Sequence, residues 1–171
     1  MSDKPLVILG SSRSNGDTRH AVDLAMAGHE FELVDLLNYN FTFYDYEYRN
    51  RKDDFQAIVP KMLGAEKIIF ATPVYWYAMS APLKIFIDRF SDLVRVEKNQ
   101  GRQLEGKKTF LISSGTDDNL PQGFEIPFQR TSEYLDMDYQ GAVYLYSGGD
   151  NNLRQKSAQK IGVEFTKLLN N

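Results

Sequence analysis

Small polar side chains gather between Gly10 and Thr18, where the sequence reads Gly-Ser-Ser-Arg-Ser-Asn-Gly-Asp-Thr. The run follows the apolar segment Leu6 to Leu9 and leads into a helix-compatible segment that begins at Asp17. The N–H groups at the start of a helix attract anions, and hydroxyl, amide and guanidinium groups bind phosphate oxygens. The loop lacks the Gly-Lys-Ser/Thr ending of an NTPase loop and the G-x-G-x-x-G spacing of a dinucleotide loop. It therefore predicts a site for a terminal phosphate, as on a mononucleotide. An ordinary turn in which Asn15 or Asp17 only caps the helix is the alternative.

Three consecutive aromatic residues, Tyr75, Trp76 and Tyr77, follow another apolar segment. A helix should begin soon after them, because Ser80 can cap it. The loop from Pro73 to Met79 would then carry the three rings as a platform for a flat ring system, with its backbone groups meeting the heteroatoms. Packing of the rings in the core is the alternative, but their polar tips would then need buried partners.

A second polar run, Ser113 to Asp117, also ends an apolar segment. Its small polar groups could bond a sugar-like chain or the edge of a pyrimidine ring. The same residue types also form routine turns, so this run alone does not identify a ligand.

The elements that would position these loops alternate between strand and helix. Apolar, β-rich segments lie at 6–9, 30–36, 67–72, 108–113 and 142–146. Such alternation predicts right-handed βαβ units and a parallel sheet covered on both faces. We expect a single domain over residues 1–171, an α/β three-layer sandwich with a five-stranded parallel sheet in the order 2-1-3-4-5. In that order a ligand lies at the carboxyl ends of the strands, beside the switch between the first and third, where the three loops would meet.

The composition narrows the chemistry. The 171 residues include no cysteine, which excludes disulfides, thiolate catalysis, a cysteine-ligated iron–sulfur cluster and a thiolate zinc site. Redox chemistry would need a bound cofactor. A net charge of −3 with scattered basic residues gives no sign of nucleic-acid or membrane-surface binding. The first apolar run is too short for a signal peptide or a membrane span, so we expect a cytoplasmic protein. His20 and His29 have no evident catalytic or metal partner, and we assign neither a metal site nor a catalytic side chain.

Other segments carry further expectations. Residues 38–50 are rich in aromatics and could cover the ligand crevice, seal a subunit contact or pack on their own subunit's surface. A helix is predicted over 53–64, where Pro60 could introduce a kink or a new start. We interpret residues 94–107 as a solvated connection and expect Asn151 or Asn152 to cap the last helix.

With both motifs in view, the chain resembles the NAD(P)H-dependent FMN reductase and quinone reductase family of the flavodoxin-like superfamily. Gly-Ser-Ser-Arg-Ser-Asn-Gly-Asp-Thr looks like its phosphate loop. Thr-Pro-Val-Tyr-Trp-Tyr-Ala-Met-Ser-Ala-Pro-Leu-Lys with Ile-Asp-Arg looks like its flavin-ring loop and the helix that follows, and is the more specific motif. The resemblance spans nearly the whole chain. Some relatives carry iron–sulfur cysteines after the second strand, whereas this chain has the aromatic segment 38–50 there.

The resemblance implies FMN bound without a covalent bond. The phosphate would be held by Ser11, Arg13, Ser14, Asn15, Gly16 and Thr18. The isoalloxazine would lie against Pro73, Val74, Tyr75, Trp76 and Tyr77. The remaining edge or the ribityl chain would meet Ser114, Gly115, Thr116 and Asp117. Arg13 could instead face a pyridine-nucleotide phosphate.

The leading hypothesis is therefore an oxidoreductase that passes hydride from NAD(P)H through FMN to a quinone, a free flavin or a similar small acceptor. Backbone N–H groups of 74–77 and 115–117 are candidates to meet the charge developing on the ring. A homodimer or homotetramer is expected from the family. A flavodoxin-type electron carrier without NAD(P)H activity is the alternative, although a charge of −3 is weak for docking to redox partners. A flavodoxin-fold interaction protein that has lost its cofactor is a third interpretation, which the intact polar loop disfavours.

Overall fold

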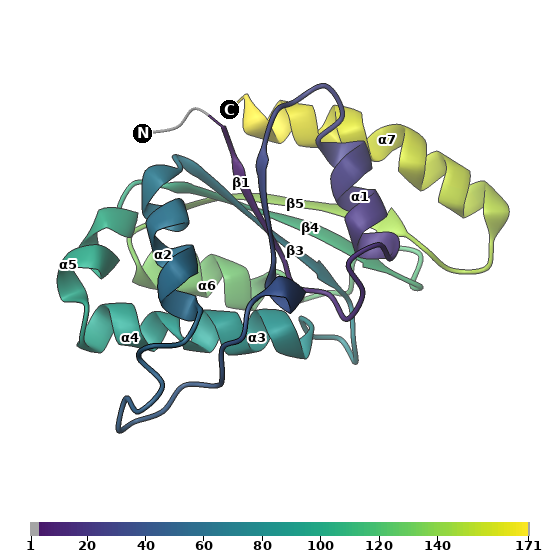
Figure 1. Cartoon of the computed structure of the whole chain (residues 1–171). Helices are drawn as coiled ribbons and strands as arrows, with labels where there is room; N and C mark the ends of the chain where they lie inside the picture. The colour runs from purple at the N-terminus through teal and green to yellow at the C-terminus, as the bar shows by residue number, and fades with distance from the viewer. Residues whose placement is uncertain (1–3, 171) are drawn as a thin grey trace.

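The computed structural model describes residues 4–170 and forms a three-layer α/β sandwich (Figure 1). Over these residues the sheet has five strands in the order β2-β1-β3-β4-β5, and every neighbouring pair is parallel. The predicted fold class and strand order are confirmed. In chain order the elements are β1 (Leu6–Leu9), α1 (Asp17–Ala25), β2 (Glu32–Asp35), η1 (Leu36–Asn38), α2 (Phe55–Gly64), β3 (Lys67–Pro73), α3 (Ala81–Asp88), α4 (Phe90–Arg95), α5 (Lys98–Gly101), η2 (Arg102–Leu104), β4 (Lys108–Gly115), α6 (Ile126–Tyr134), β5 (Asp138–Tyr146) and α7 (Asn151–Leu169).

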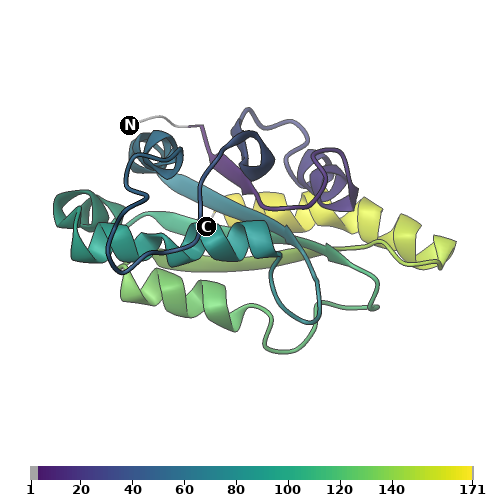
Figure 2. The same ribbon diagram turned by 60° about the horizontal axis from the view of Figure 1, so that its bottom comes forward.

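Helices cover both faces of the sheet because its central strands are apolar on both sides. In β1, Leu6 and Ile8 pack in one cluster with α2, α3, α4 and α6, whereas Val7 and Leu9 pack in the other with α1 and α7. Figures 1 and 2 show these two helical layers on opposite sides of the strands. Burial on both faces explains why the strands read as continuous apolar runs rather than as alternating patterns.

The helix starts show where the sequence patterns hold and where they fail. Ser80 caps α3 by accepting the Leu83 N–H at 3.4 Å, as predicted. The prediction of Asn151 or Asn152 as the cap of α7 is wrong, because Asp150 accepts the N–H groups of Asn152 and Leu153. The positive end of the helix dipole also favours a carboxylate at this position.

Two central segments are more regular than the sequence indicates. Pro60 lies inside α2, which runs as one helix from Phe55 to Gly64 and does not restart there. Residues 94–107 include the end of α4, all of α5 and η2, and a fully buried Leu104. The interpretation of this stretch as a solvated connection is therefore wrong, since Leu104 packs in the same core as α2 and α4. Among residues 4–170, no helix is both long and apolar enough to cross a membrane.

Candidate functional site

The loops after β1, β3 and β4 meet at the carboxyl edge of the sheet around a cavity of about 160 Å³. Its wall also includes the residue after β5. The lining residues are Ser11, Arg13, Asp17, Thr18, Pro73, Val74, Tyr75, Ser114, Gly115, Thr116 and Ser147. The two polar loops and the aromatic loop that the sequence analysis singled out therefore converge at one place. Ser14, Asn15, Gly16, Trp76, Tyr77 and Asp117 lie outside its wall, and the wall includes Asp17 and Ser147, which the sequence reasoning did not select.

The first loop leaves the start of α1 without a side-chain cap. The N-cap is Gly16, and no side chain accepts a hydrogen bond there, so neither Asn15 nor Asp17 acts as the cap. The first N–H groups of a helix have no partner within the helix. Buried Ser11 and Thr18 add hydroxyls, and Thr18 Oγ1 lies 2.8 Å from Ser114 Oγ. This end of the cavity has the donors that an anion needs.

Three charged side chains border the same end. Arg13 Nη2 lies 3.6 Å from Asp17 Oδ2, and Arg154 Nη2 lies 3.7 Å from Asp17 Oδ1. Arg154 also donates to the Ser147 carbonyl at 3.0 Å. No sequence pattern points to Arg154, because only the packing of α7 beside α1 brings it to the first loop (Figure 1).

A single serine joins the first and second loops. Ser80 Oγ donates to the Gly10 carbonyl at 2.6 Å, while the Ser80 N–H donates to Thr72 Oγ1 at 3.0 Å. The same Ser80 oxygen caps α3. The end of β1, the end of β3 and the start of α3 are thus fixed to one another behind the cavity.

The aromatic loop forms a two-residue turn. Tyr75 and Ala78 exchange two backbone hydrogen bonds of 3.0 Å, and Trp76 and Tyr77 between them have φ values of 50° and 62°. These left-handed conformations suit Asn and Gly, and they cost a bulky residue on the order of 1–2 kcal/mol each. Only Tyr75 lines the cavity, whereas Trp76 is 95% and Tyr77 is 72% exposed. The core-packing alternative is excluded, and two of the three rings project away from the protein.

The third loop contributes a narrow wall. A Cβ on Gly115 would lie 2.7 Å from the Tyr144 hydroxyl oxygen and 3.2 Å from Val74 Cβ. The Tyr144 hydroxyl donates to the Asp117 carbonyl at 2.9 Å, and burial raises the pKa of Tyr144 to about 12. Only glycine fits at this position without displacing Tyr144 or Val74. Ser113 instead bonds the Thr72 carbonyl and joins β4 to β3.

The aromatic segment 38–50 does not border the cavity. Phe41 packs edge-on against Phe86 of α3, and Tyr44 packs against Tyr46 and Tyr48. Fully buried Arg89, between α3 and α4, donates to the Thr42 carbonyl at 3.1 Å and to the carboxylates of Asp53 and Asp92. The segment therefore lies along α3 and α4. This agrees in part with the alternative that its rings pack on their own subunit's surface, but Phe43 and Tyr46 remain exposed.

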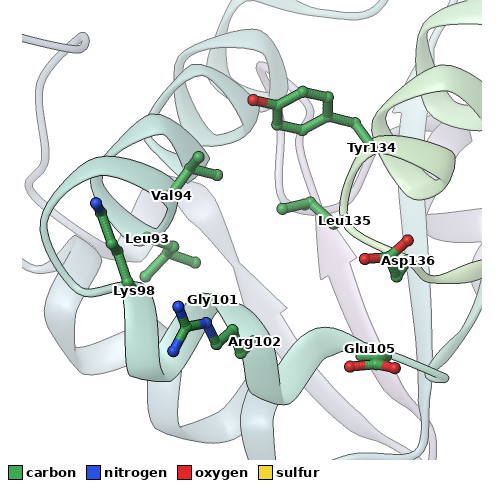
Figure 3. Close-up of a pocket in the computed structure, with 9 residues that line it drawn as sticks. All are labelled: Leu93, Val94, Lys98, Gly101, Arg102, Glu105, Tyr134, Leu135 and Asp136. Atoms are coloured by element: carbon green, nitrogen blue, oxygen red, sulfur yellow. The ribbon is translucent and has the colours of Figure 1, made fainter.

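A larger hollow of about 350 Å³ lies between α4, α5 and the end of α6 (Figure 3). Leu93 and Val94 face Tyr134 and Leu135 across it. It lies near the starts of β4 and β5, at the opposite edge of the sheet, and none of the three loops reaches it. The smaller cavity carries the anion-binding groups, and we take it as the candidate site.

Comparisons with known proteins concern the chain as a whole. The NADPH-dependent FMN reductase family model matches residues 4–123. YwqN of Bacillus subtilis (strain 168), whose name places it among NAD(P)H-dependent FMN-containing oxidoreductases, is 30% identical over 150 residues, covering 82% of this chain and 83% of YwqN.

Solved structures share the fold. The Trp repressor binding protein from Bacillus subtilis aligns with a TM-score of 0.74 at 25% identity, over 93% of this chain and 95% of that one. General stress protein 14 from Treponema denticola, solved in complex with FMN, aligns with a TM-score of 0.69 at 19% identity, over 98% of each chain.

Proposed function

Because the chain belongs to the NADPH-dependent FMN reductase family, we propose that it passes hydride from NAD(P)H through bound FMN to a quinone, a free flavin or a similar small acceptor. The family makes it an FMN-dependent oxidoreductase that uses NAD(P)H. The acceptors named are part of the proposal. The observation that carries the proposed function is the convergence of an uncapped helix start, buried hydroxyls and an aromatic wall in one cavity.

The residues of the cavity fit FMN. The uncapped start of α1, Arg13 and the hydroxyls of Ser11 and Thr18 are donors suited to a terminal phosphate. Ser114, Gly115 and Thr116 form another part of the cavity wall, against which a ribityl chain or a ring edge would lie. Complete ligand pockets usually measure about 300–1,000 Å³, so a cavity of about 160 Å³ encloses only part of a flavin nucleotide. The rest of the ligand would extend past Tyr75 toward the exposed turn.

In the proposed mechanism the flavin supplies the hydride chemistry when bound. The protein's own part is to bind the phosphate, orient the ring against Val74 and Tyr75, and offer N–H groups to its polar edge. The structure narrows the set of backbone N–H groups that could donate to the polar edge of the ring. Val74 N–H donates to the Ser114 carbonyl and Tyr75 N–H to the Ala78 carbonyl, so both are engaged.

Four N–H groups of the two loops remain as candidates. Among the described residues, those of Trp76, Tyr77, Thr116 and Asp117 donate to no other protein group. The proposed polar contacts to the ring therefore come from the tip of the turn and from the residues just after β4.

A homodimer or homotetramer is part of the proposal. The cavity is smaller than a flavin, and Trp76, Tyr77, Phe43 and Tyr46 expose large aromatic surfaces on one subunit. Exposed aromatic patches are typical of interaction sites. We also propose a cytoplasmic location, where reduced nicotinamide nucleotides are available. The flavodoxin-type carrier is not favoured, since the family and YwqN both use NAD(P)H.

One preparation tests the proposal. The purified protein should be yellow, should release FMN on denaturation, and should oxidise NADPH or NADH when a quinone or free flavin is added. A yellow protein inert toward both nucleotides would instead support the electron carrier. A colourless protein that refuses added FMN would refute flavin binding altogether.

A further inference from the structure

The charged cluster at the phosphate end of the cavity contains an unexpected carboxylate. Asp17 lines the cavity in the first turn of α1, where an anion is expected to bind. The negative charge of Asp17 interacts favourably with the helix dipole, but it would repel a phosphate dianion bound at the same N–H groups. The site therefore needs something to offset Asp17.

Arg154 is placed to do so. Its guanidinium lies 3.7 Å from the Asp17 carboxylate and donates to the Ser147 carbonyl, and both of these residues line the cavity. Arg154 itself is not part of the cavity wall, and it contacts the wall through Asp17 and Ser147. Arg13 contacts the other oxygen of Asp17 at 3.6 Å and lines the cavity directly.

The neighbouring charges are engaged elsewhere. Arg19, the next arginine of α1, pairs with Asp23 at 2.8 Å. Asp150, one turn before Arg154, accepts the N–H groups at the start of α7. Arg154 is therefore the second cation that contacts Asp17, beside Arg13.

We infer that Arg154 is a positioning residue that neutralises Asp17, so that the 5′-phosphate of FMN can bind at the start of α1 beside a carboxylate. This inference rests on the proposed function. With Arg154 present the three side chains carry two positive charges and one negative charge. Without Arg154, the carboxylate and Arg13 cancel, and the dianion meets no net positive charge from this cluster.

The test compares FMN with riboflavin, which has the same ring and ribityl chain but no phosphate. Affinities for both are measured by flavin fluorescence quenching in the wild type, Arg154→Gln, Asp17→Asn and the double variant. Arg154→Gln should weaken FMN binding about tenfold and riboflavin binding less than about twofold. In the Asp17→Asn background the same change should weaken FMN binding less than about threefold, since the charge it offsets is gone.

The controls separate charge from structure. Lys160→Gln removes one positive charge from the same helix, but Lys160 lines a different cavity beside β5, so both affinities should stay within about twofold. Arg154→Lys keeps the charge and should retain most of the FMN affinity.

Three results would overturn the inference. One is an equal weakening of FMN and riboflavin binding, which would mean that Arg154 only stabilises the loop at Ser147. Another is an equal effect of Arg154→Gln with and without Asp17. The third is an FMN affinity of Arg154→Gln equal to that of the wild type. A wild-type protein that binds neither flavin would refute the proposed function, and this inference with it.

Discussion

Gly115 is the position where the structure makes the sharpest demand on the sequence. In Gly115→Ala, the new methyl group would lie 2.7 Å from the Tyr144 hydroxyl oxygen and 3.2 Å from Val74 Cβ. The hydroxyl cannot move away freely, because it donates to the Asp117 carbonyl at 2.9 Å. The substitution must therefore displace Val74, break that hydrogen bond, or do both.

The expected cost follows from these contacts. Overpacking of this kind costs about 1–3 kcal/mol, and a lost hydrogen bond costs about 0.5–1.5 kcal/mol. Alanine restricts the unfolded chain more than glycine, which returns about 0.4–1 kcal/mol. We expect Gly115→Ala to lower the free energy of unfolding by about 2 kcal/mol, or the Tm by about 4–8 °C for a chain of this size. Flavin binding should weaken as well, because Gly115 and Val74 form part of the cavity wall.

Urea unfolding and flavin titration of four variants test this reasoning. Tyr144→Phe removes the hydroxyl, so Gly115→Ala should cost clearly less in that background than in the wild type. Gly149→Ala is the matched control, since a Cβ there meets nothing within 4 Å, and its stability should change by less than about 0.5 kcal/mol. Equal costs of Gly115→Ala with and without the Tyr144 hydroxyl would refute the assignment of the clash.

The remaining predictions concern the first loop, the aromatic turn and the alkaline range. Asn15→Asp adds a negative charge beside the proposed phosphate and should weaken FMN binding at least about tenfold, with riboflavin as the control; unchanged FMN affinity would place the phosphate elsewhere. Tyr77→Gly should raise the free energy of unfolding by about 0.5–1 kcal/mol, because relief at φ 62° exceeds the added chain entropy, whereas Tyr46→Gly, at an exposed residue with ordinary φ, should give no gain. A loss of stability in Tyr77→Gly would argue against strain in the turn. Stability should fall as the pH rises from about 10 to about 12, because the pKa of Tyr144 is raised to about 12 and the unfolded chain loses that proton first. Urea unfolding at pH 9 to 12 should show a smaller fall for Tyr144→Phe, and identical slopes would contradict the cause.

The fold could be predicted because its signals are local. Each buried strand is an apolar run next to a polar loop, and strict alternation with helices fixes the parallel topology. The register of β5 could not be predicted in the same way. That strand begins at Asp138 rather than Ala142, because a bulge at Gln140 and a left-handed Gly141, with φ 127°, let polar residues join the ladder opposite Lys108 and Thr109.

Some residues of the candidate site could be predicted from local signals, and others could not. Ser11, Thr18, Tyr75 and Ser114 could be selected because each lies within three residues of the end of a predicted strand or of the start of a helix. In the sequence, Trp76 and Tyr77 group with Tyr75 because the three rings are consecutive in one predicted loop. The turn geometry then separates them, since a two-residue hairpin sends its central side chains outward. The place of Arg154 at the site could not be predicted without the tertiary structure, because its partner Asp17 lies at the other end of the chain.

The triple role of Ser80 has a consequence for how this site comes into being. One hydroxyl and its own amide tie the mouth of the first βα unit, the end of the third strand and the next helix together, so neither half of the pocket can be completed ahead of the other. Partly folded chains should therefore lack ligand affinity entirely rather than possess a fraction of it. In hydrogen exchange, the amides of Gly10 and Ser80 should open in the same cooperative event.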